Sequence, residues 1–171
     1  MDKYRVGFAV ALIIFALDQL SKWFVTGPLM LREVGQIVLL PIFNFTYTEN
    51  NGISLGLLNA TNPVGRWMLV ALTSAIAVGV AYWIGKERNR VDRIALGMVL
   101  GGALGNILDR TRHGYVVDFL DLHFGAVRPF LVFNVSDAAI SIGVVILLMR
   151  AFLTRKERTA GASPEETIEH A

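Results

Sequence analysis

Four long apolar segments restrict the folds open to this chain more than any other feature of its sequence. They cover Val6 to Val25, Trp67 to Ile84, Ile94 to Leu108 and Val135 to Phe152, and the third is the shortest. A helix needs roughly 20 apolar residues to span a bilayer, so each segment is about long enough. With 54% hydrophobic residues and a mean hydropathy of +0.52, the composition is too apolar for an ordinary soluble domain. The sequence therefore predicts an all-α membrane protein, a bundle of four transmembrane helices.

The end of the chain differs in composition from the rest. Residues 1–158 are expected to form a single polytopic membrane domain, whereas residues 159–171 are rich in Glu, Ala, Ser and Thr and are expected to be a disordered tail. The first apolar segment is predicted to be a retained helix rather than a cleaved signal peptide. Asp18 and Lys22 interrupt it, and no small-x-small cleavage pattern follows.

Basic residues cluster at one set of predicted helix ends. Cytoplasmic loops carry an excess of Lys and Arg, so such clusters indicate the side of the membrane. The clusters precede the first segment, fill the loop between the second and third, and follow the fourth; they are Lys3, Arg5, Lys86, Arg88, Arg90, Arg93, Arg150, Arg155, Lys156 and Arg158. Both termini are therefore expected in the cytoplasm, and the longer connections, residues 26–66 and 109–134, outside it.

The first outer connection has a pattern typical of short strands. Residues 36–48 are rich in β-branched and aromatic side chains, and they alternate over residues 43–48. Pro41 cannot donate a ladder hydrogen bond, so we expect a short or edge strand there. In the second connection, residues 115–120 are compatible with either a strand or a surface helix. The expected fold thus adds a small extracytoplasmic β element to the four helices.

Several common chemistries find no support in the sequence. The chain has no cysteine, which excludes disulfides, a thiol nucleophile and cysteine metal ligands. His113, Asp121 and His123 lack the spacing of a compact metal site, and neither a metal nor another cofactor is expected. Ser136 and Ser141 have no histidine or lysine at a defined spacing to activate them, and helix capping explains Ser136. No basic stripe is interleaved with aromatic residues, so nucleic acid is not an expected partner.

Three polar side chains are expected to reach a similar depth in the membrane. Asp18, Asn106 and Asp137 each lie thirteen positions from a basic residue at the cytoplasmic end of their helix. At about 1.5 Å of rise per residue this offset is roughly 20 Å, which reaches the outer part of the bilayer. Polar residues at that depth usually face the bundle interior. The equal offsets predict that the three side chains converge on one site. The alternative is that the offsets are equal by chance, because polar residues are least costly near the ends of membrane helices.

Asp118 precedes the last apolar segment, and Asp137 lies at the start of that segment. A carboxylate in a membrane helix costs about 2.5–3.5 kcal/mol at mid-membrane and less near the interface, so a compensating role is expected. Two neighbouring carboxylates can share one proton, which lets one act as an acid while the other activates water. From spacing alone, catalysis and a structural or proton-relay role are both open. Asp18 and Lys22, four positions apart, can likewise form an ion pair or shape an adjacent polar site.

Five short motifs, taken together and in order, resemble those of one known family. They are Asp18-Gln-Leu-Ser-Lys22, Asn50-Asn-Gly-Ile-Ser, Gly101-Gly-Ala-Leu-Gly-Asn-Ile-Leu-Asp-Arg110, Val116-Val-Asp-Phe119 and Phe133-Asn-Val-Ser-Asp-Ala-Ala-Ile140. From about Asp18 to Ile140 the chain is similar to the bacterial lipoprotein signal peptidases, also called signal peptidase II, and the last three motifs are specific. In one departure, Ile53-Ser-Leu-Gly follows Gly52 where the family often has Ala-Ala-Phe-Ser, so contacts made by that stretch are open.

The resemblance implies a metal-independent aspartic endopeptidase of the bacterial inner membrane, with its active site toward the periplasm. Such an enzyme removes the signal peptide of diacylglyceryl-modified prolipoproteins just before the lipid-modified cysteine, so these precursors and membrane lipids are the implied partners. Asp118 and Asp137 become the catalytic dyad. The residues implied to contact substrate, or to lie beneath it on the first helix, are Asn50, Gly52, Asn106, Arg110, Asn134, Asp18 and Lys22.

A non-catalytic polytopic membrane protein is the alternative from another class. A proton-coupled transporter subunit could use Asp18, Asp118 and Asp137 as a relay. Transporters of that kind tend to show inverted repeats and broken helices, and the sequence shows neither. The peptidase is therefore the expected function.

Overall fold

The computed structural model describes residues 4–52, 63–125, 127 and 129–160, with side chains described as far as residue 153. Four helices are long and apolar enough to cross a membrane: α1 (Arg5–Thr26), α3 (Pro63–Lys86), α4 (Arg90–Arg112) and α5 (Val135–Ala160). They coincide with the four apolar segments, which confirms the expected membrane fold.

The third membrane helix, α4, is longer than its apolar segment indicated. It has 23 residues, whereas the apolar segment within it runs only from Ile94 to Leu108. Its start is set by Asn89, whose side chain accepts hydrogen bonds from the backbone N–H groups of Val91 and Asp92. Its end includes the polar residues 109–112, because backbone hydrogen bonding rather than apolarity determines where a helix stops.

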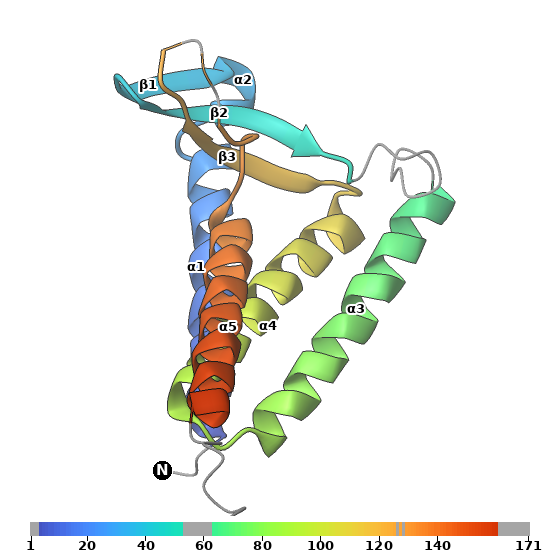
Figure 1. Cartoon of the computed structure of the whole chain (residues 1–171). Helices are drawn as coiled ribbons and strands as arrows, with labels where there is room; N and C mark the ends of the chain where they lie inside the picture. Colours follow the sequence, from blue (N-terminus) through green and yellow to red (C-terminus); the bar gives the residue numbers. More distant parts are fainter. Residues whose placement is uncertain (1–3, 53–62, 126, 128, 161–171) are drawn as a thin grey trace, which may run out of the picture.

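Helix α4 is the one against which the other three pack. Gly97 and Gly101 face α1, and a Cβ atom at either position would overlap a backbone carbonyl oxygen of α1, that of Gly7 or Ala11. These small residues therefore allow a close approach of α1 and α4. Helix α3 diverges from α1 and α5 toward the sheet end of the molecule (Figure 1), and most of its contacts with the rest of the bundle are made with α4.

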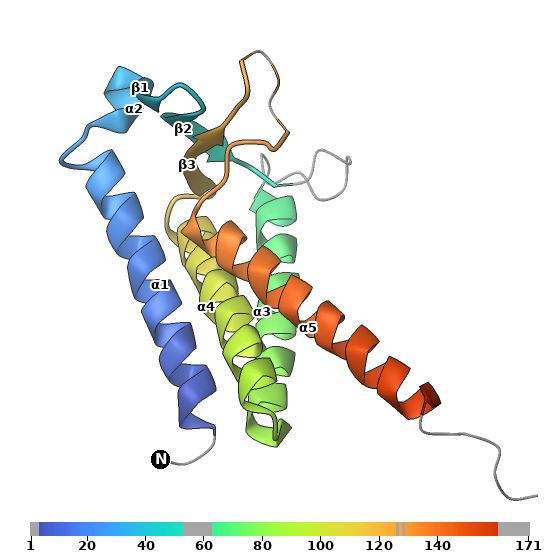
Figure 2. The same ribbon diagram turned by 60° about the vertical axis from the view of Figure 1, so that its left-hand side comes forward.

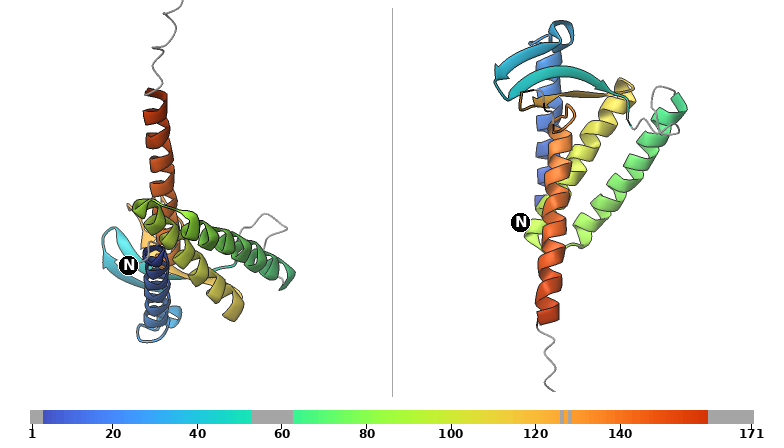
Figure 3. Two further views of the ribbon diagram at one scale, coloured as in Figure 1. Left: turned by 90° about the horizontal axis from the view of Figure 1, so that it is seen from below. Right: turned by 45° about the horizontal axis from the view of Figure 1, so that its top comes forward.

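Helix α5 crosses the others obliquely and its C-terminal end projects from the bundle (Figures 2 and 3). It runs through Ala160, two residues into the expected tail. The rest of that tail, residues 161–171, lies outside the described residues.

A three-stranded antiparallel sheet covers one end of the bundle (Figure 1). The strands β1 (Gln36–Leu40), β2 (Phe43–Asn50) and β3 (Val116–Leu122) lie in the order β1-β2-β3, and the short helix α2 (Leu31–Val34) precedes them. The expected β element is therefore confirmed, and residues 116–120 of the stretch 115–120 belong to a strand rather than a surface helix. Pro41 lies in the turn that ends the five-residue edge strand β1, as its missing donor predicted.

The sheet is anchored to α1 by a small hydrophobic cluster. Val25 from α1, Leu31 from α2 and Phe119 from β3 are buried together. Opposite Phe119 the β2–β3 register shifts by one residue between Phe45 and Thr48, which places a bulge beside Asp118. The sheet lies at one end of the molecule, whereas the N-terminus and the α3–α4 connection lie at the other (Figure 1).

Candidate active site

Asn134 joins the two aspartates that lie near the start of the last membrane helix. Asp118 lies in β3 and Asp137 in the first turn of α5, where the sheet covers the start of that helix. The side-chain amide of Asn134 donates to Oδ1 of Asp118 at 2.6 Å, and its backbone N–H donates to Oδ2 of Asp137 at 3.3 Å. The fold thus brings together two carboxylates that lie in different secondary-structure elements, the strand β3 and the helix α5.

The start of α5 holds Asp137 in place. Oδ1 of Asn134, the residue just before the helix, accepts a hydrogen bond from the backbone N–H of Asp137 at 3.0 Å. With the return bond from Asn134 to Asp137, this is a reciprocal capping box. Ser136 is not the cap that the sequence indicated, because its Oγ is buried without a hydrogen-bond partner among the described residues. The bonds that begin the helix therefore also orient a candidate catalytic group.

Two more asparagines complete the set of donors. Asn106 of α4 donates to Oδ1 of Asp137, and Asn50 at the end of β2 donates to Oδ2 of Asp118, both at 2.9 Å. Each of the four carboxylate oxygens therefore accepts a hydrogen bond from an asparagine. Gly52 directs Asn50, because its backbone N–H donates to Oδ1 of Asn50 at 2.8 Å and its φ of +90° closes the turn.

Burial raises the pKa of Asp118 to about 6 from its ordinary value of 3.8, and only 1% of this residue is exposed. The nearby charge of Asp137 raises that pKa further, whereas the hydrogen bonds from Asn50 and Asn134 and the charge of Lys22 lower it. Asp137 itself is only partly buried. The pair can therefore keep one proton close to neutral pH while one carboxyl group stays accessible.

Arg110 brings a positive charge to the aspartates from α4. Its guanidinium interacts electrostatically with Asp137 first and Asp118 second. Its Nε is buried without a hydrogen-bond partner in the described part of the chain. An unpaired arginine donor beside a carboxylate pair is available to a peptide carbonyl.

Asp18 and Lys22 lie beneath the site rather than in its lining. Nζ of Lys22 is 2.8 Å from Oδ2 of Asp18 and 2.8 Å from Oδ2 of Asp109. Asp18, Lys22 and Asp109 are 0%, 5% and 3% exposed. The ion pair between Asp18 and Lys22 is confirmed. Protein partners enclose and occupy their charged groups, so a place beneath the substrate fits these two residues better than direct contact, and their role toward substrate stays a prediction.

The predicted convergence of the three equally deep polar residues is also confirmed. Besides the bond between Asn106 and Asp137, Oδ1 of Asp18 accepts a hydrogen bond from the backbone N–H of Ser136 at 3.0 Å, across 118 positions of sequence. Sequence reasoning missed Gln19, which donates to Oδ2 of Asp18 at 3.1 Å and to Oδ1 of Asp109 at 3.0 Å. No local spacing could have revealed a pair that is 90 positions apart.

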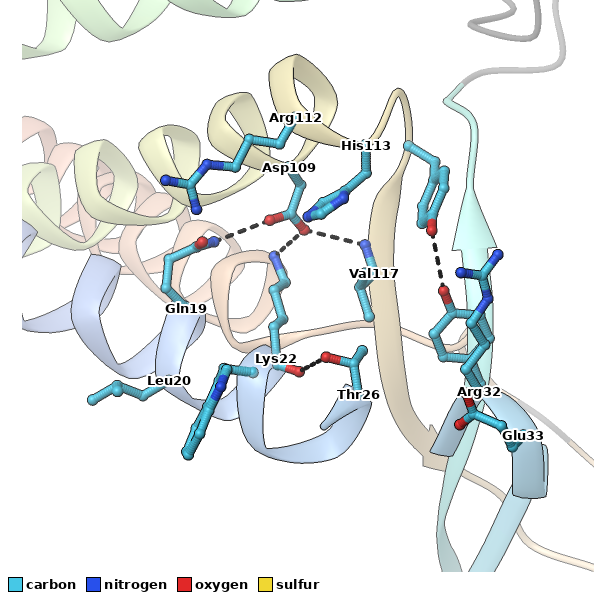
Figure 4. A pocket seen from close by; sticks show the side chains of 13 residues that line it. Gln19, Leu20, Lys22, Thr26, Arg32, Glu33, Asp109, Arg112, His113 and Val117 are labelled. Carbon is cyan, nitrogen blue, oxygen red and sulfur yellow. Dashed lines mark hydrogen bonds and ion pairs between the residues drawn. The ribbon is translucent and has the colours of Figure 1, made fainter. Parts of the chain in front are cut away.

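A cavity of about 530 Å³ lies on the other side of β3. Side chains alternate along a strand, so Val117 lines this cavity while Asp118 points to the opposite face. Figure 4 shows the cavity with Lys22 and Asp109 among its lining residues and Asp109 bonded to Gln19, Lys22 and Val117. The cavity therefore borders the buried charges beneath the site and not the two aspartates themselves.

The histidines considered as metal ligands have other neighbours. His123 hydrogen-bonds to Asn44 at 2.9 Å, and the His113 ring lies 6.0 Å from that of Tyr115. Asp121 accepts a bond from Thr46 at 2.8 Å. Within the described ranges, no three His, Asp or Glu side chains are grouped as metal ligands.

The fold and this constellation define a polytopic membrane protein with a hydrogen-bonded pair of carboxyl groups at one end of its helices. Comparison with known families makes the class specific. The model for signal peptidase (SPase) II matches residues 10–153, so the chain belongs to the signal peptidase II family and is a membrane protease.

Individual relatives agree with this assignment. The chain is 52% identical over 164 residues to a protein of Rhizorhabdus wittichii, covering 96% of this chain and 93% of the relative. It is also 52% identical over 161 residues to a protein of Sphingopyxis alaskensis, covering 94% and 93%. Both relatives are named lipoprotein signal peptidase. Nothing in these similarities supports the transporter alternative.

Two solved structures share the fold. One bacterial membrane enzyme, determined by the in meso method at 2.3 Å resolution, gives a TM-score of 0.75 at 25% identity and covers 94% of this chain and 93% of its own. A second, at 1.9 Å resolution, gives a TM-score of 0.72 at 26% identity and covers 85% and 91%.

Proposed function

We propose that the chain is an aspartic endopeptidase that removes the signal peptide from diacylglyceryl-modified prolipoproteins, just before the lipid-modified cysteine. Family membership and the names of the relatives support lipoprotein signal peptides as the substrate. The aspartic mechanism rests on one observation, the set of asparagine donors that holds Asp118 and Asp137 together.

The pair can supply both the acid and the base that peptide hydrolysis needs. One carboxylate takes a proton from water as the water oxygen attacks the scissile carbonyl carbon, and the other carboxyl gives its proton to the carbonyl oxygen. In the second step a hydroxyl of the resulting diol returns a proton to the pair. The C–N bond then breaks, and the leaving nitrogen takes a proton from the pair. The raised pKa of Asp118, about 6, favours a pair that starts and ends with one proton.

Arg110 and Asn50 are proposed to bind the substrate backbone. A signal peptide that enters from lipid in extended form carries unpaired carbonyl and amide groups, and each missing partner costs about 1–3 kcal/mol. The unpaired Nε of Arg110 is a suitable donor, and Asn50 ends the strand beside Asp118. Arg110→Ala and Asn50→Ala should therefore raise KM and lower turnover with little change in Tm. A large loss of stability with normal activity in the folded fraction would assign both residues to the scaffold instead.

The dyad is tested by replacing each aspartate with asparagine. Asp118→Asn and Asp137→Asn should each lower cleavage by about 10²-fold or more while the protein still folds. Cleavage of a purified lipidated prolipoprotein is resolved by mass spectrometry. Asp92→Asn is the matched control, because Asp92 forms an ion pair with Arg150 between α4 and α5, far along the helices from the dyad. Turnover above about a tenth of wild type in either dyad variant would exclude the mechanism.

The proposed location is the bacterial inner membrane, with both termini in the cytoplasm and the dyad toward the periplasm. The chain ends and the α3–α4 connection carry the clustered basic residues, and the sheet lies at the other end of the molecule (Figure 1). In this orientation the site faces the side of the membrane on which the exported parts of prolipoproteins emerge, and membrane lipids surround the path of entry.

A further inference from the structure

We propose that Lys22 is a positioning residue for both aspartates, because its ammonium group ties together two buried carboxylates that each hold the backbone N–H just before one member of the dyad. This inference rests on the proposed function. It gives the buried ion cluster of Asp18, Lys22 and Asp109 a role in catalysis in addition to its contribution to folding.

One arm of the cluster leads to Asp118. Oδ2 of Asp109 accepts a hydrogen bond from the backbone N–H of Val117 at 3.1 Å, and the same oxygen lies 2.8 Å from Nζ of Lys22. Figure 4 shows both interactions converging on Asp109 at the end of α4. Since Val117 directly precedes Asp118 in β3, this bond fixes the strand at the point where the catalytic side chain leaves it.

The other arm leads to Asp137. Oδ1 of Asp18 accepts the backbone N–H of Ser136 at 3.0 Å, while its Oδ2 lies 2.8 Å from Nζ of Lys22. Ser136 directly precedes Asp137 in the first turn of α5. The absence of a side chain at Gly105 makes this approach possible, because a Cβ there would lie 2.5 Å from Oδ2 of Asp18. In both arms a buried carboxylate accepts the backbone N–H that precedes a dyad aspartate, and both carboxylates contact the ammonium group of Lys22.

Lys22 also reaches the dyad through a third contact. Its Nζ lies 3.5 Å from Oδ1 of Asn106, whose amide donates to Asp137 at 2.9 Å. The cluster is almost fully enclosed, so its charges are poorly screened by solvent. Movement of Lys22 would therefore displace both aspartates together.

The charge of Lys22 has a second consequence for the pH dependence of the reaction. The charged groups that act on Asp118 are Asp137 from α5, Lys22 from α1 and Arg110 from α4. Lys22 lowers the pKa of Asp118, so removal of its charge should move the pH–rate profile toward higher pH. A residue that only stabilises the fold would lower the amount of active protein without moving that profile.

The experiment compares Lys22→Met with the double variant Lys22→Met/Asp109→Asn. The single variant can fail to fold because it leaves two buried carboxylates without a counter-ion. The double variant keeps the net charge of the cluster, one cation and two anions becoming one anion, and removes only the bridge. Asp92→Asn, whose ion pair with Arg150 also joins two membrane helices, is the control. Full-length proteins are purified in detergent, their folded fraction is measured, and kcat, KM and the pH profile are determined on a lipidated prolipoprotein.

We expect kcat of the folded double variant to fall by about 10²-fold, the loss typical of a displacement of about 1 Å, with KM changed by less than about twofold. In the folded fraction of Lys22→Met, which removes the cation alone, the pH profile should also move upward. Asp92→Asn should retain the wild-type kcat, KM and pH profile. An unchanged kcat in the folded double variant would overturn the positioning role, as would an equal loss of kcat in Asp92→Asn. These outcomes are distinct from failure of the proposed function, which would appear as activity retained by Asp118→Asn or Asp137→Asn.

Discussion

The carboxamide of Asn134 donates to Asp118 at 2.6 Å through its nitrogen while its oxygen caps α5. Besides longer hydrogen bonds to Asn106 and Val117, this side chain therefore makes one contact that begins a membrane helix and one that holds the proposed catalytic carboxyl group of the sheet. Serine and asparagine cap helices about equally well, but serine has no amide to reach across to Asp118. The two contacts can consequently be separated by substitution.

Asn134→Ala should lose both contacts, and Asn134→Ser only the one to Asp118. We expect Asn134→Ser to be more stable than Asn134→Ala by about 0.5–2 kcal/mol, the usual value of an N-cap. Both variants should lose turnover to a similar extent, because both leave Oδ1 of Asp118 without its donor. Thermal unfolding in detergent and cleavage assays measure the two effects. If turnover followed stability, with Asn134→Ser near wild type, the bond to Asp118 would have no catalytic role.

The raised pKa of Asp118 predicts how stability changes with pH. The folded state binds this proton more tightly than the unfolded chain does, so the contribution of Asp118 to stability is fully present below about pH 4 and is lost as pH rises through about 6. Asp118→Asn has no proton to lose. The difference in Tm between Asp118→Asn and wild type should therefore change in favour of the variant as pH rises from about 4 to about 6. Above about pH 6 this difference should stay constant. A difference in Tm that is constant over this range, or that falls with pH, would show that burial does not hold the proton.

The sequence was sufficient for the membrane fold because hydropathy is a local property. Each apolar segment is long enough to specify a helix without knowledge of its neighbours, and equal offsets from the basic ends predicted that Asp18, Asn106 and Asp137 would converge. The choice of strand or helix for residues 115–120 could not be made locally. It depends on pairing with β2, which lies about 70 positions earlier in the chain.

The candidate site was only partly accessible from the sequence. Spacing indicated two carboxylates but left their role open, and the family motifs supplied the dyad. The contact between Lys22 and Asp109 depends on how closely α1 approaches α4, which Gly97 and Gly101 permit. The capping box of Asn134 and Asp137 was the one local signal that could have been read, because asparagine three positions before an acidic residue at a helix start is typical of such a cap.

The proposed orientation is tested with reporter fusions. A reporter placed after Arg158 or between Lys86 and Arg93 should be active in the cytoplasm, and one placed near Asn59 should be active in the periplasm, because clustered basic residues stay on the cytoplasmic side. An alkaline phosphatase and a green fluorescent protein fusion at each position give complementary signals. A periplasmic C-terminus would reverse the orientation and place the dyad toward the cytosol.

The last prediction concerns the turn that directs Asn50. Gly52 has a φ of +90°, where a residue with a side chain is strained by about 1–3 kcal/mol. Gly52→Ala should therefore open the turn, release Oδ1 of Asn50 and rotate its amide away from Asp118, which lowers turnover by about tenfold or more through misplacement. Gly52→Asn should lose less, because asparagine tolerates positive φ better than alanine does.

Gly79→Ala is the control for this glycine, since Gly79 lies within α3 with no other atom within 4 Å of where its Cβ would stand. Alanine is the better helix former by about 1 kcal/mol, so this variant should keep wild-type turnover with an equal or higher Tm. Cleavage by Gly52→Ala at the wild-type rate would show that the turn at Gly52 does not orient Asn50 for the reaction. The same ranking, with Gly52→Asn between alanine and wild type, should appear in kcat at saturating substrate, because the turn positions the donor of Asp118. KM should rise in the same order, because Asn50 is also proposed to bind the substrate backbone.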